Sequence, residues 1–275
     1  MFQLIAYLKF LFHSKNEHGV HSPFVYNLVI SCFYDATNFS AYDKLKVHRE
    51  ALLENKNTIE VSDFGAGSRV FKSNTRAIAK IVKTAGITPK NSKLLFRIIN
   101  YFQPATILEI GTSLGLATTS MALGNPKSTI FSLEGCSETQ GVAKKYFIEN
   151  MEQEVQVHFI NTKFESYLPQ ENQQKPTTFD FIYFDGNHSK AATLDYFEAL
   201  ISTILPHSIW IFDDIHWSEE MEEAWEILKQ HPKVTLTIDT FQWGIVFFRP
   251  EHQKEHFIIT PDKTFSSYFF EKIKF

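Results

Sequence analysis

The stretch ATILEIGTSLG, residues 105–115, decides the fold. Its first six residues are a nearly continuous apolar run, which is typical of a strand buried on both faces of a parallel sheet. The glycines of the following GTSLG let the backbone turn sharply. A helix is predicted before this stretch, from Thr88-Pro89 to Pro104, and another after it, at about 115–123. This order of helix, strand, turn and helix predicts an α/β unit.

The alternation continues to about residue 250. Further buried strands are predicted at residues 128–133, 155–160, 179–184 and 208–212. The apolar runs 233–238 and 243–248 lie only four residues apart, which is too few for a parallel crossover, so they predict an antiparallel hairpin. We therefore expect an α/β fold with a doubly wound, Rossmann-like parallel sheet, a terminal antiparallel hairpin and an N-terminal helical extension.

The sequence also predicts where two helices begin and how the chain divides into parts. Ser137 with Gln140 predicts a capping box for the helix after the second strand, and Ser218 predicts the start of the helix after the fifth. Three parts are expected. They are an N-terminal helical cap or lid (1–88), the α/β domain (89–250) and a C-terminal tail (251–275) that ends in the aromatic TFSSYFFEKIKF.

Composition limits the partners and the compartment. The 275 residues hold 27 basic and 31 acidic side chains, a net charge of −4, which disfavours nucleic acid. No Lys/Arg-rich run predicts binding to an anionic membrane. The two cysteines form no CxxC motif, so we expect the reducing cytoplasm. The apolar residues 1–13 are too few to span a bilayer and predict an amphipathic helix, with an interfacial anchor as the alternative. This helix and the aromatic tail are candidate homodimer surfaces.

Ligands of such sheets bind at the carboxyl ends of the strands, so these ends are where functional residues are expected. The turn from Gly111 to Gly115 has the spacing GxxxG, which lacks the middle glycine of the dinucleotide fingerprint GxGxxG and disfavours a nicotinamide cofactor. Glu134 ends the second strand 23 residues after Gly111, the spacing of a carboxylate that binds both ribose hydroxyls. A solvated loop glutamate is the alternative. Phe164 could cover an adenine or simply begin the next helix.

The fourth and fifth strands end in DGNH (185–188) and DDIHW (213–217). Polar side chains crowded where a sheet presents its ligand indicate a site. Asp185, Asp213 and Asp214 form a candidate oxygen-ligand set for Mg²⁺, and the alternative is a carboxylate cluster that positions water and substrate.

Taken together, ILEIGTSLG, the acidic end of strand two, YFDGNHSK, WIFDDIHW and the hairpin resemble the class I S-adenosylmethionine-dependent methyltransferases, specifically the branch of small-molecule O-methyltransferases. The resemblance covers roughly residues 90–250. It implies cofactor-binding roles for Glu109, Gly111, Thr112, Ser113, Gly115, Glu134, Thr162, Lys163, Phe164 and Asp185. It implies catalytic roles for Asp185, His188, Asp213 and Asp214.

The chain departs from that branch at two positions. Lys190 stands where many relatives have an aromatic residue, and Asp213-Asp214 replaces the Asp-Asn common in metal-using members. His188 is the first candidate for the general base, with a carboxylate or a bound metal as the alternative. The predicted activity is methyl transfer to an oxygen of a small-molecule acceptor. The alternatives are a non-catalytic cofactor-binding module and a methyltransferase that acts on a protein.

A second glycine-rich stretch, SDFGAGS at residues 62–68, is not expected to bind the cofactor. Barely a strand precedes it, and no acidic residue follows at the ribose spacing. Its glycines are expected to turn the chain between helices. The alternative is that this stretch, with Arg69 and Lys72, closes over the cofactor or acceptor.

Overall fold

The computed structural model describes residues 1–62, 71–151, 155–169, 177–251 and 253–262. The helices before the main sheet are α1 (Phe2–His13), η1 (Glu17–Gly19), α2 (Pro23–Leu28), the π-helix η2 (Val29–Phe33), α3 (Ala41–Glu54), α4 (Ile78–Thr84) and α5 (Pro89–Phe102). Those that follow the first strand of the main sheet are α6 (Leu116–Gly124), α7 (Ser137–Asn150), α8 (Phe164–Tyr167), α9 (Lys190–Leu200), η3 (Ile201–Thr203) and α10 (Glu219–Gln230). Within these ranges no helix is both long and apolar enough to cross a bilayer.

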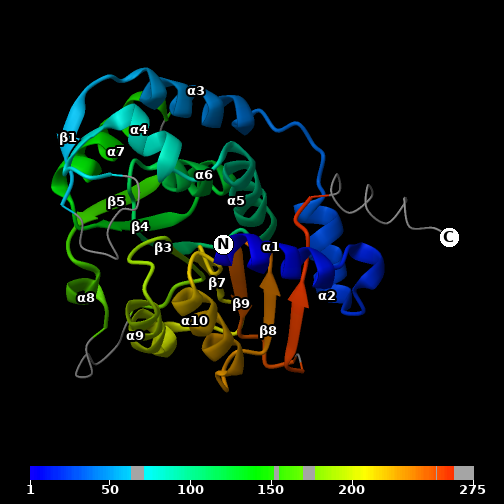
Figure 1. Cartoon of the computed structure of the whole chain (residues 1–275). Coiled ribbons are helices and arrows are strands. Elements are labelled where there is room, and N and C mark those ends of the chain that lie inside the picture. Colours follow the sequence, from blue (N-terminus) through cyan, green and yellow to red (C-terminus); the bar gives the residue numbers. More distant parts are fainter. Residues whose placement is uncertain (63–70, 152–154, 170–176, 252, 263–275) are drawn as a thin grey trace.

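An eight-stranded sheet runs through the centre of the molecule (Figure 1). Its strands, in sheet order, are β10 (Glu255–Ile258), β8 (Leu236–Asp239), β9 (Trp243–Phe247), β7 (Ile209–Asp213), β6 (Phe181–Phe184), β3 (Thr106–Ile110), β4 (Thr129–Glu134) and β5 (Gln156–Asn161). The five from β7 to β5 pair in parallel, and β9 pairs antiparallel with both β7 and β8. The predicted parallel sheet and terminal hairpin are therefore confirmed.

Side chains alternate between two apolar layers because successive residues of a strand point to opposite faces. Ile107, Phe181 and Ile211 face one layer, which also contains residues of α2, α4, α5 and α6. Leu108 and Ile182 face the other layer, which contains residues of α9 and α10. With helices on both faces, the sheet is doubly wound. Its direction of winding changes at β3, which lies between β4 and β6.

Local sequence explains where the long helices begin and end. The Thr88 hydroxyl accepts a hydrogen bond from the amide of Asn91, and Pro89 occupies the first turn of α5. Gln103 ends that helix in the left-handed conformation. Ser218 caps α10 as predicted, accepting from the amide of Met221. The capping prediction for Ser137 is wrong. Cys136 is the N-cap of α7, Ser137 is already helical, and no side chain caps this end.

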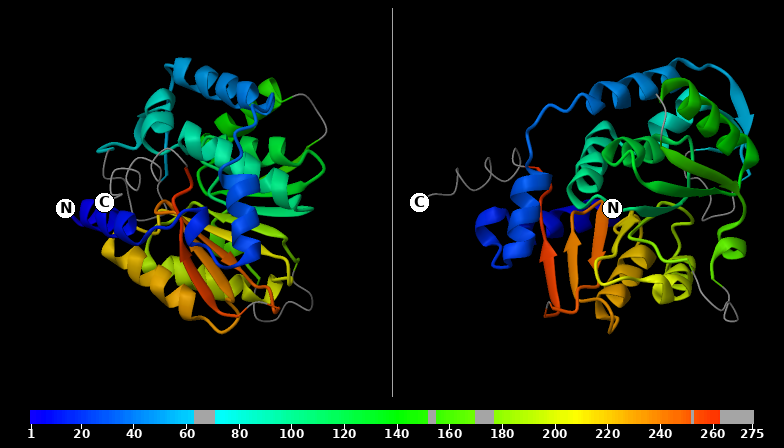
Figure 2. Two further views of the ribbon diagram at one scale, coloured as in Figure 1. Left: turned by 90° about the vertical axis from the view of Figure 1, so that its right-hand side faces the viewer. Right: turned by 180° about the vertical axis from the view of Figure 1, so that it is seen from behind.

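The N-terminal segments lie around the sheet rather than in it (Figures 1 and 2). Helix α3 packs over α5, α6 and α7, while α1 and α2 lie toward the edge formed by β8 and β10. Lys15 bridges Ile259, and the Tyr34 hydroxyl donates to the carbonyl of Thr260, so the chain near both ends meets at this edge. The three-part division of the chain stays a prediction.

Two segments differ from expectation. Strand β1 (Thr58–Glu60) pairs antiparallel with β2 (Thr75–Ala77), so the chain between them joins two strands and not two helices, as was expected. The stretch 63–70, which holds most of SDFGAGS and Arg69, lies outside the described residues. Strand β10, which pairs in parallel with β8, lies in the segment predicted to be a tail. The aromatic stretch from residue 263 onward is also outside the described residues.

Candidate active site

The predicted site residues lie at the carboxyl edge of the sheet, around the turns that follow β3, β4, β5, β6 and β7. At the β3 turn, Gly111 has φ +104°, and a Cβ there would meet the carbonyl oxygen of Asp185 at 2.2 Å. The turns after β3 and β6 therefore touch through a backbone contact that no side chain could enter. This contact joins two halves of the site: a cofactor half on β3, β4 and β5, and an acid half on β6, β7 and the hairpin.

Left-handed backbone conformations concentrate at this edge. Ser113, Asn187 and Asp214 all have φ between 48° and 57° although none is a glycine, and they lie in the turns after β3, β6 and β7. Such conformations cost about 1–3 kcal/mol each and persist where the surrounding structure fixes them, commonly at functional sites. The three turns are thus held in demanding conformations at the place where ligands bind in this architecture.

Glu134 is fixed in the cofactor half by backbone donors. Its Oε2 accepts from the amide of Ser113 at 2.9 Å, and its Oε1 accepts from the amide of Cys136 at 3.0 Å. Burial raises the pKa of Glu134, and these amide bonds oppose the rise. Each carboxylate oxygen can accept a further hydrogen bond. Glu134 is therefore oriented at the β4 end, not a solvated loop residue.

Glu109 lies deeper in the same half and is fully buried. Its Oε2 accepts from the hydroxyls of Thr118, at 2.6 Å, and Ser132, while Oε1 has no partner among the described residues. Burial raises the pKa of Glu109 to about 8, although the two hydroxyl bonds oppose the rise. Burial thus favours the protonated form of Glu109 and leaves its Oε1 as a buried polar atom without a partner among the described residues.

The other predicted cofactor residues frame this half. The Thr112 hydroxyl lies 2.6 Å from that of Ser132, and Gly115, with φ +78°, is the N-cap of α6. The Thr162 amide donates to the Glu134 carbonyl, and Lys163 is the N-cap of α8. Phe164 does begin a helix, and its ring packs edge-on against Tyr196 and contacts the backbone at Gly186. The alternative that Phe164 begins the next helix is therefore confirmed, and its contact with an adenine stays a prediction.

The acid half brings together all four predicted catalytic residues. His188 Nε2 lies 3.5 Å from Asp185 Oδ1 and 3.9 Å from Asp214 Oδ2. Burial alone would lower the pKa of His188, but the hydrogen bond to Asp185 and the charge of Asp214 raise it to about 9. These partners favour the imidazolium form of the ring, which donates hydrogen bonds, whereas only the neutral ring accepts a proton as a base.

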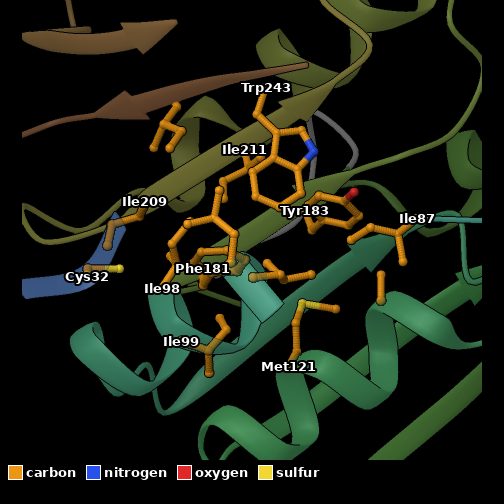
Figure 3. Packing of buried hydrophobic residues seen from close by; sticks show 14 of the residues in the cluster. Cys32, Ile87, Ile98, Ile99, Met121, Phe181, Tyr183, Ile209, Ile211 and Trp243 are labelled. Atoms are coloured by element: carbon orange, nitrogen blue, oxygen red, sulfur yellow. The ribbon is translucent and has the colours of Figure 1, made fainter. Parts of the chain in front are cut away.

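Asp213 is the most enclosed carboxyl of this half. Its Oδ1 accepts from the Asp214 amide at 2.9 Å and from Gln242 Nε2 at 2.8 Å, while the Tyr183 hydroxyl donates to Oδ2 at 3.4 Å. Burial raises the pKa of Asp213 well above its usual range, and the neighbouring charge of Asp185 adds to the rise. Figure 3 shows Tyr183 beside Trp243 in the core, where their rings form a T-shaped pair with centroids 6.0 Å apart. The Tyr183 hydroxyl that contacts Asp213 is therefore held by the packing of the core.

Gln242 and Tyr183 were not predicted from the sequence. Gln242 occupies the turn between β8 and β9, and its Nε2 also donates to Asp214 Oδ1 at 2.5 Å. The order of the strands in the sheet explains why Gln242 lies at this site. Strand β9 pairs with β7 so that Trp243, the residue after Gln242, lies opposite Asp213. Had the hairpin been assigned to the edge next to the fifth strand, the turn residue before Trp243 would have been expected at the acid half.

The three aspartates do not fit Mg²⁺ as arranged. Carboxylate oxygens are the ligands that this ion prefers. However, Asp213 and Asp214 each direct an oxygen to the Gln242 amide, and the nearest oxygens of Asp185 and Asp214 face the His188 ring. Across the described ranges, no three His, Cys, Asp or Glu side chains converge as a metal-ligand set. The metal assignment stays a prediction that this geometry does not support.

Comparison with known proteins identifies the kind of domain that carries this site. Residues 108–215 match a family model described as a methyltransferase domain. The chain carries a methyltransferase domain. This match confirms the predicted enzyme class, a methyltransferase, and agrees with the resemblance to class I S-adenosylmethionine-dependent methyltransferases that the sequence motifs indicate. The match runs from β3 to the turn after β7, which includes the turns that carry the predicted residues from Glu109 to Asp214.

Solved structures share the fold of this methyltransferase domain. An O-methyltransferase from Bacillus cereus in complex with SAH is 18% identical with a TM-score of 0.52, over 77% of this chain and 92% of that one. A Podospora anserina methyltransferase bound to SAH is 14% identical with a TM-score of 0.56, over 84% and 97%. An O-methyltransferase of tomaymycin synthesis from Streptomyces achromogenes, in complex with SAM, is 16% identical with a TM-score of 0.51, over 78% and 91%. No curated protein matches the chain.

Proposed function

We propose that this methyltransferase uses S-adenosylmethionine to methylate an oxygen of a small-molecule acceptor. The observation that supports the proposal is the backbone contact between Gly111 and Asp185, because it joins the turn beside the oriented Glu134 to the turn that begins the acid half. The similar solved structures that contain SAH or SAM support the choice of cofactor.

The cofactor half has the chemistry to hold an adenosyl group. Glu134 can accept hydrogen bonds from both ribose hydroxyls because its orientation is already fixed by the amides of Ser113 and Cys136. Its charge would repel a 2′-phosphate. The glycine at position 111 lets the turn after β3 lie against the backbone of Asp185, so that the cofactor half adjoins the acid half. Thr162, Lys163 and Phe164, in the neighbouring turn, are assigned to the adenine side.

When bound, S-adenosylmethionine supplies an electrophilic methyl group on a sulfonium. The acid half must then orient the acceptor hydroxyl and remove its proton. The His188 imidazolium can stabilise the developing oxyanion by charge and hydrogen bonding, because a preorganised donor in a buried site is effective at this task. The proton then passes to a carboxylate, and Asp214 is our candidate because its Oδ2 faces His188. The proposal thus assigns the general base to a carboxylate, the alternative to His188 given in the sequence analysis.

Several finer points belong to the same proposal. A cytoplasmic location accords with two free, buried cysteines, and the net negative charge accords with an acceptor other than nucleic acid. The exposed apolar side chains of α1, among them Leu4, Leu8 and Phe12, support a homodimer. Mg²⁺ takes no part in the proposed chemistry.

A turnover assay tests the activity. Purified protein is incubated with S-adenosylmethionine and matched acceptors, a catechol, a phenol and the corresponding aniline, and both SAH and the methylated product are measured by mass spectrometry. We expect product only from the hydroxyl acceptors. We also expect His188→Ala to lower kcat by about 10²-fold or more, the usual contribution of a positioned proton-transfer or oxyanion group.

The outcomes separate the alternatives. SAH binding without methylation of any acceptor, including proteins, would favour the non-catalytic binding module. Methylation of the aniline alone would replace oxygen by nitrogen as the target. Binding of NAD in place of SAH would reject the class.

A further inference from the structure

The two aspartates that end β7 share one neutral donor. Gln242 Nε2 lies 2.8 Å from Asp213 Oδ1 and 2.5 Å from Asp214 Oδ1. A primary amide carries two N–H bonds, so one Gln242 nitrogen can satisfy both carboxylates at once. The opposite orientation of the amide would place its oxygen against two carboxylate oxygens, a repulsive contact. The hydrogen-bond network therefore assigns the nitrogen to this position.

The turn that carries Gln242 is fixed from its other side. Phe241 has φ +71°, and its amide donates to Asp239 Oδ1 at 2.7 Å. Its ring stacks on His216, with centroids 5.2 Å apart, and meets the ring of Tyr7 at 4.8 Å. Helix α1 and the turn after β7 thus pack against Phe241, the residue next to Gln242. This packing holds the turn in the position from which Gln242 reaches Asp213 and Asp214.

The opposite side of the acid half is occupied by the His188 ring, between Asp185 and Asp214. Asp185, Asp213 and Asp214 consequently each face a nitrogen donor. Gln242 and His188 engage both oxygens of Asp214 and one oxygen each of Asp185 and Asp213. A divalent cation that used all three carboxylates would have to displace a donor from Asp214, because Mg²⁺ and Mn²⁺ require several oxygen ligands at short range. The donors and the cation therefore compete for one position.

We propose that the Gln242 amide and the His188 ring take the place of a divalent cation, so that the acid half is a metal-free cluster. In it, Gln242 is a positioning residue that holds Asp213 and Asp214 for catalysis. The statement about metal binding stands on the geometry alone, while the catalytic role of Gln242 rests on the proposed function. Gln242 was absent from the sequence-based site, and its role replaces the ligand set predicted for Asp185, Asp213 and Asp214.

Titration with Mn²⁺, followed by electron paramagnetic resonance and calorimetry, tests the metal statement without any turnover. The wild-type chain is expected to bind Mn²⁺ no more tightly than a Kd of about 1 mM, the weak end of oxygen-ligand sites. Gln242→Glu exchanges both donors for a fourth carboxylate and should bind at least about tenfold more tightly. Gln242→Ala, which only removes the donors, should bind more tightly than wild type as well. Gln230→Ala, on an exposed residue of α10, is the matched control.

Each result has a defined meaning. Wild-type binding at micromolar Mn²⁺ that is lost in Gln242→Ala would make Gln242 a metal ligand and overturn the proposal. Folded Gln242→Glu and Gln242→Ala chains that bind no better than wild type would also overturn it, since the carboxylates would then not converge around the amide. Circular dichroism establishes folding, and Gln242→Ala keeps the test valid if the glutamate variant does not fold.

The catalytic statement has its own readout. Methyl transfer by the wild type should be unchanged by EDTA, and Gln242→Ala should lower kcat while the affinity for SAH stays unchanged. Gln242→Asn, which keeps the amide one methylene shorter, should restore part of kcat. Loss of activity in EDTA would overturn the metal-free cluster. Absence of activity in every sample would count against the proposed function and leave the Mn²⁺ result standing.

Discussion

The two halves of the site are built on different physical principles. The cofactor half uses backbone amides, hydroxyls and a tight glycine turn, and its buried Glu109 is neutral because burial raises its pKa to about 8. The acid half uses charged side chains, and its His188 is cationic because Asp185 and Asp214 raise its pKa to about 9 despite burial. The comparison of Glu109 with His188 shows that burial disfavours the charged form of a side chain whose partners are hydroxyls, while nearby opposite charges can outweigh burial.

The contact that joins the halves gives the largest expected effect. In Gly111→Ala the new Cβ would meet the Asp185 carbonyl oxygen at 2.2 Å in a backbone conformation that disfavours alanine. We expect the free energy of unfolding to fall by at least about 3 kcal/mol in urea titrations, the range for strain at a special backbone position. Gly141→Ala is the control, because nothing lies within 4 Å of its Cβ in helix α7, and it should add about 1 kcal/mol. Equal effects would mean that the halves are not in contact.

A second experiment tests the neutral state of Glu109. The folded state holds the proton up to a pKa of about 8, against an ordinary value of 4.5, so wild-type stability should fall as pH rises between these values and then level off. The contribution of Glu109 to this slope should approach about 1.4 kcal/mol per pH unit, and the raised pKa values of Glu134 and Asp213 add to the total. Glu109→Gln keeps the acceptor for Thr118 and Ser132 without a titrating group, so its stability should fall less steeply with pH, by the contribution of Glu109.

Exposed Glu149→Gln serves as the control and should leave the slope unchanged. The same pH dependence in wild type and Glu109→Gln from pH 5 to 8 would show that Glu109 is ionised, and the electrostatic contrast between the halves would then disappear.

The smallest expected effect compares one helix start from each half. Ser218→Ala removes the bond to the Met221 amide at the start of α10 and should cost about 1 kcal/mol in thermal or urea unfolding. Ser137→Ala at the start of α7 should cost almost nothing, because the exposed Ser137 side chain caps no amide. A cost at Ser137 equal to that at Ser218 would restore the capping box predicted there.

The same contrast explains what the sequence could predict. Gly111 and Glu134 were identified because one strand–helix–strand unit fixes their spacing. Ser137 was misassigned by one residue, since a helix boundary depends on backbone geometry that the sequence pattern does not specify. Gln242 was missed because its neighbours Asp213 and Asp214 are brought to it by sheet order, which places β9 against β7. Strand β10 was missed because its four residues, EHFI, have no extended apolar run.

The central claim is that one half holds the cofactor and the other carries the chemistry. Parallel calorimetric titrations of SAH into wild type, Glu134→Ala and Asp214→Asn test it most directly. Because each hydrogen bond to a charged group contributes about 1.5–3 kcal/mol, Glu134→Ala should weaken binding at least about 100-fold, while Asp214→Asn should bind within about threefold of wild type. Equal losses in both variants, or wild-type affinity in Glu134→Ala, would contradict the account.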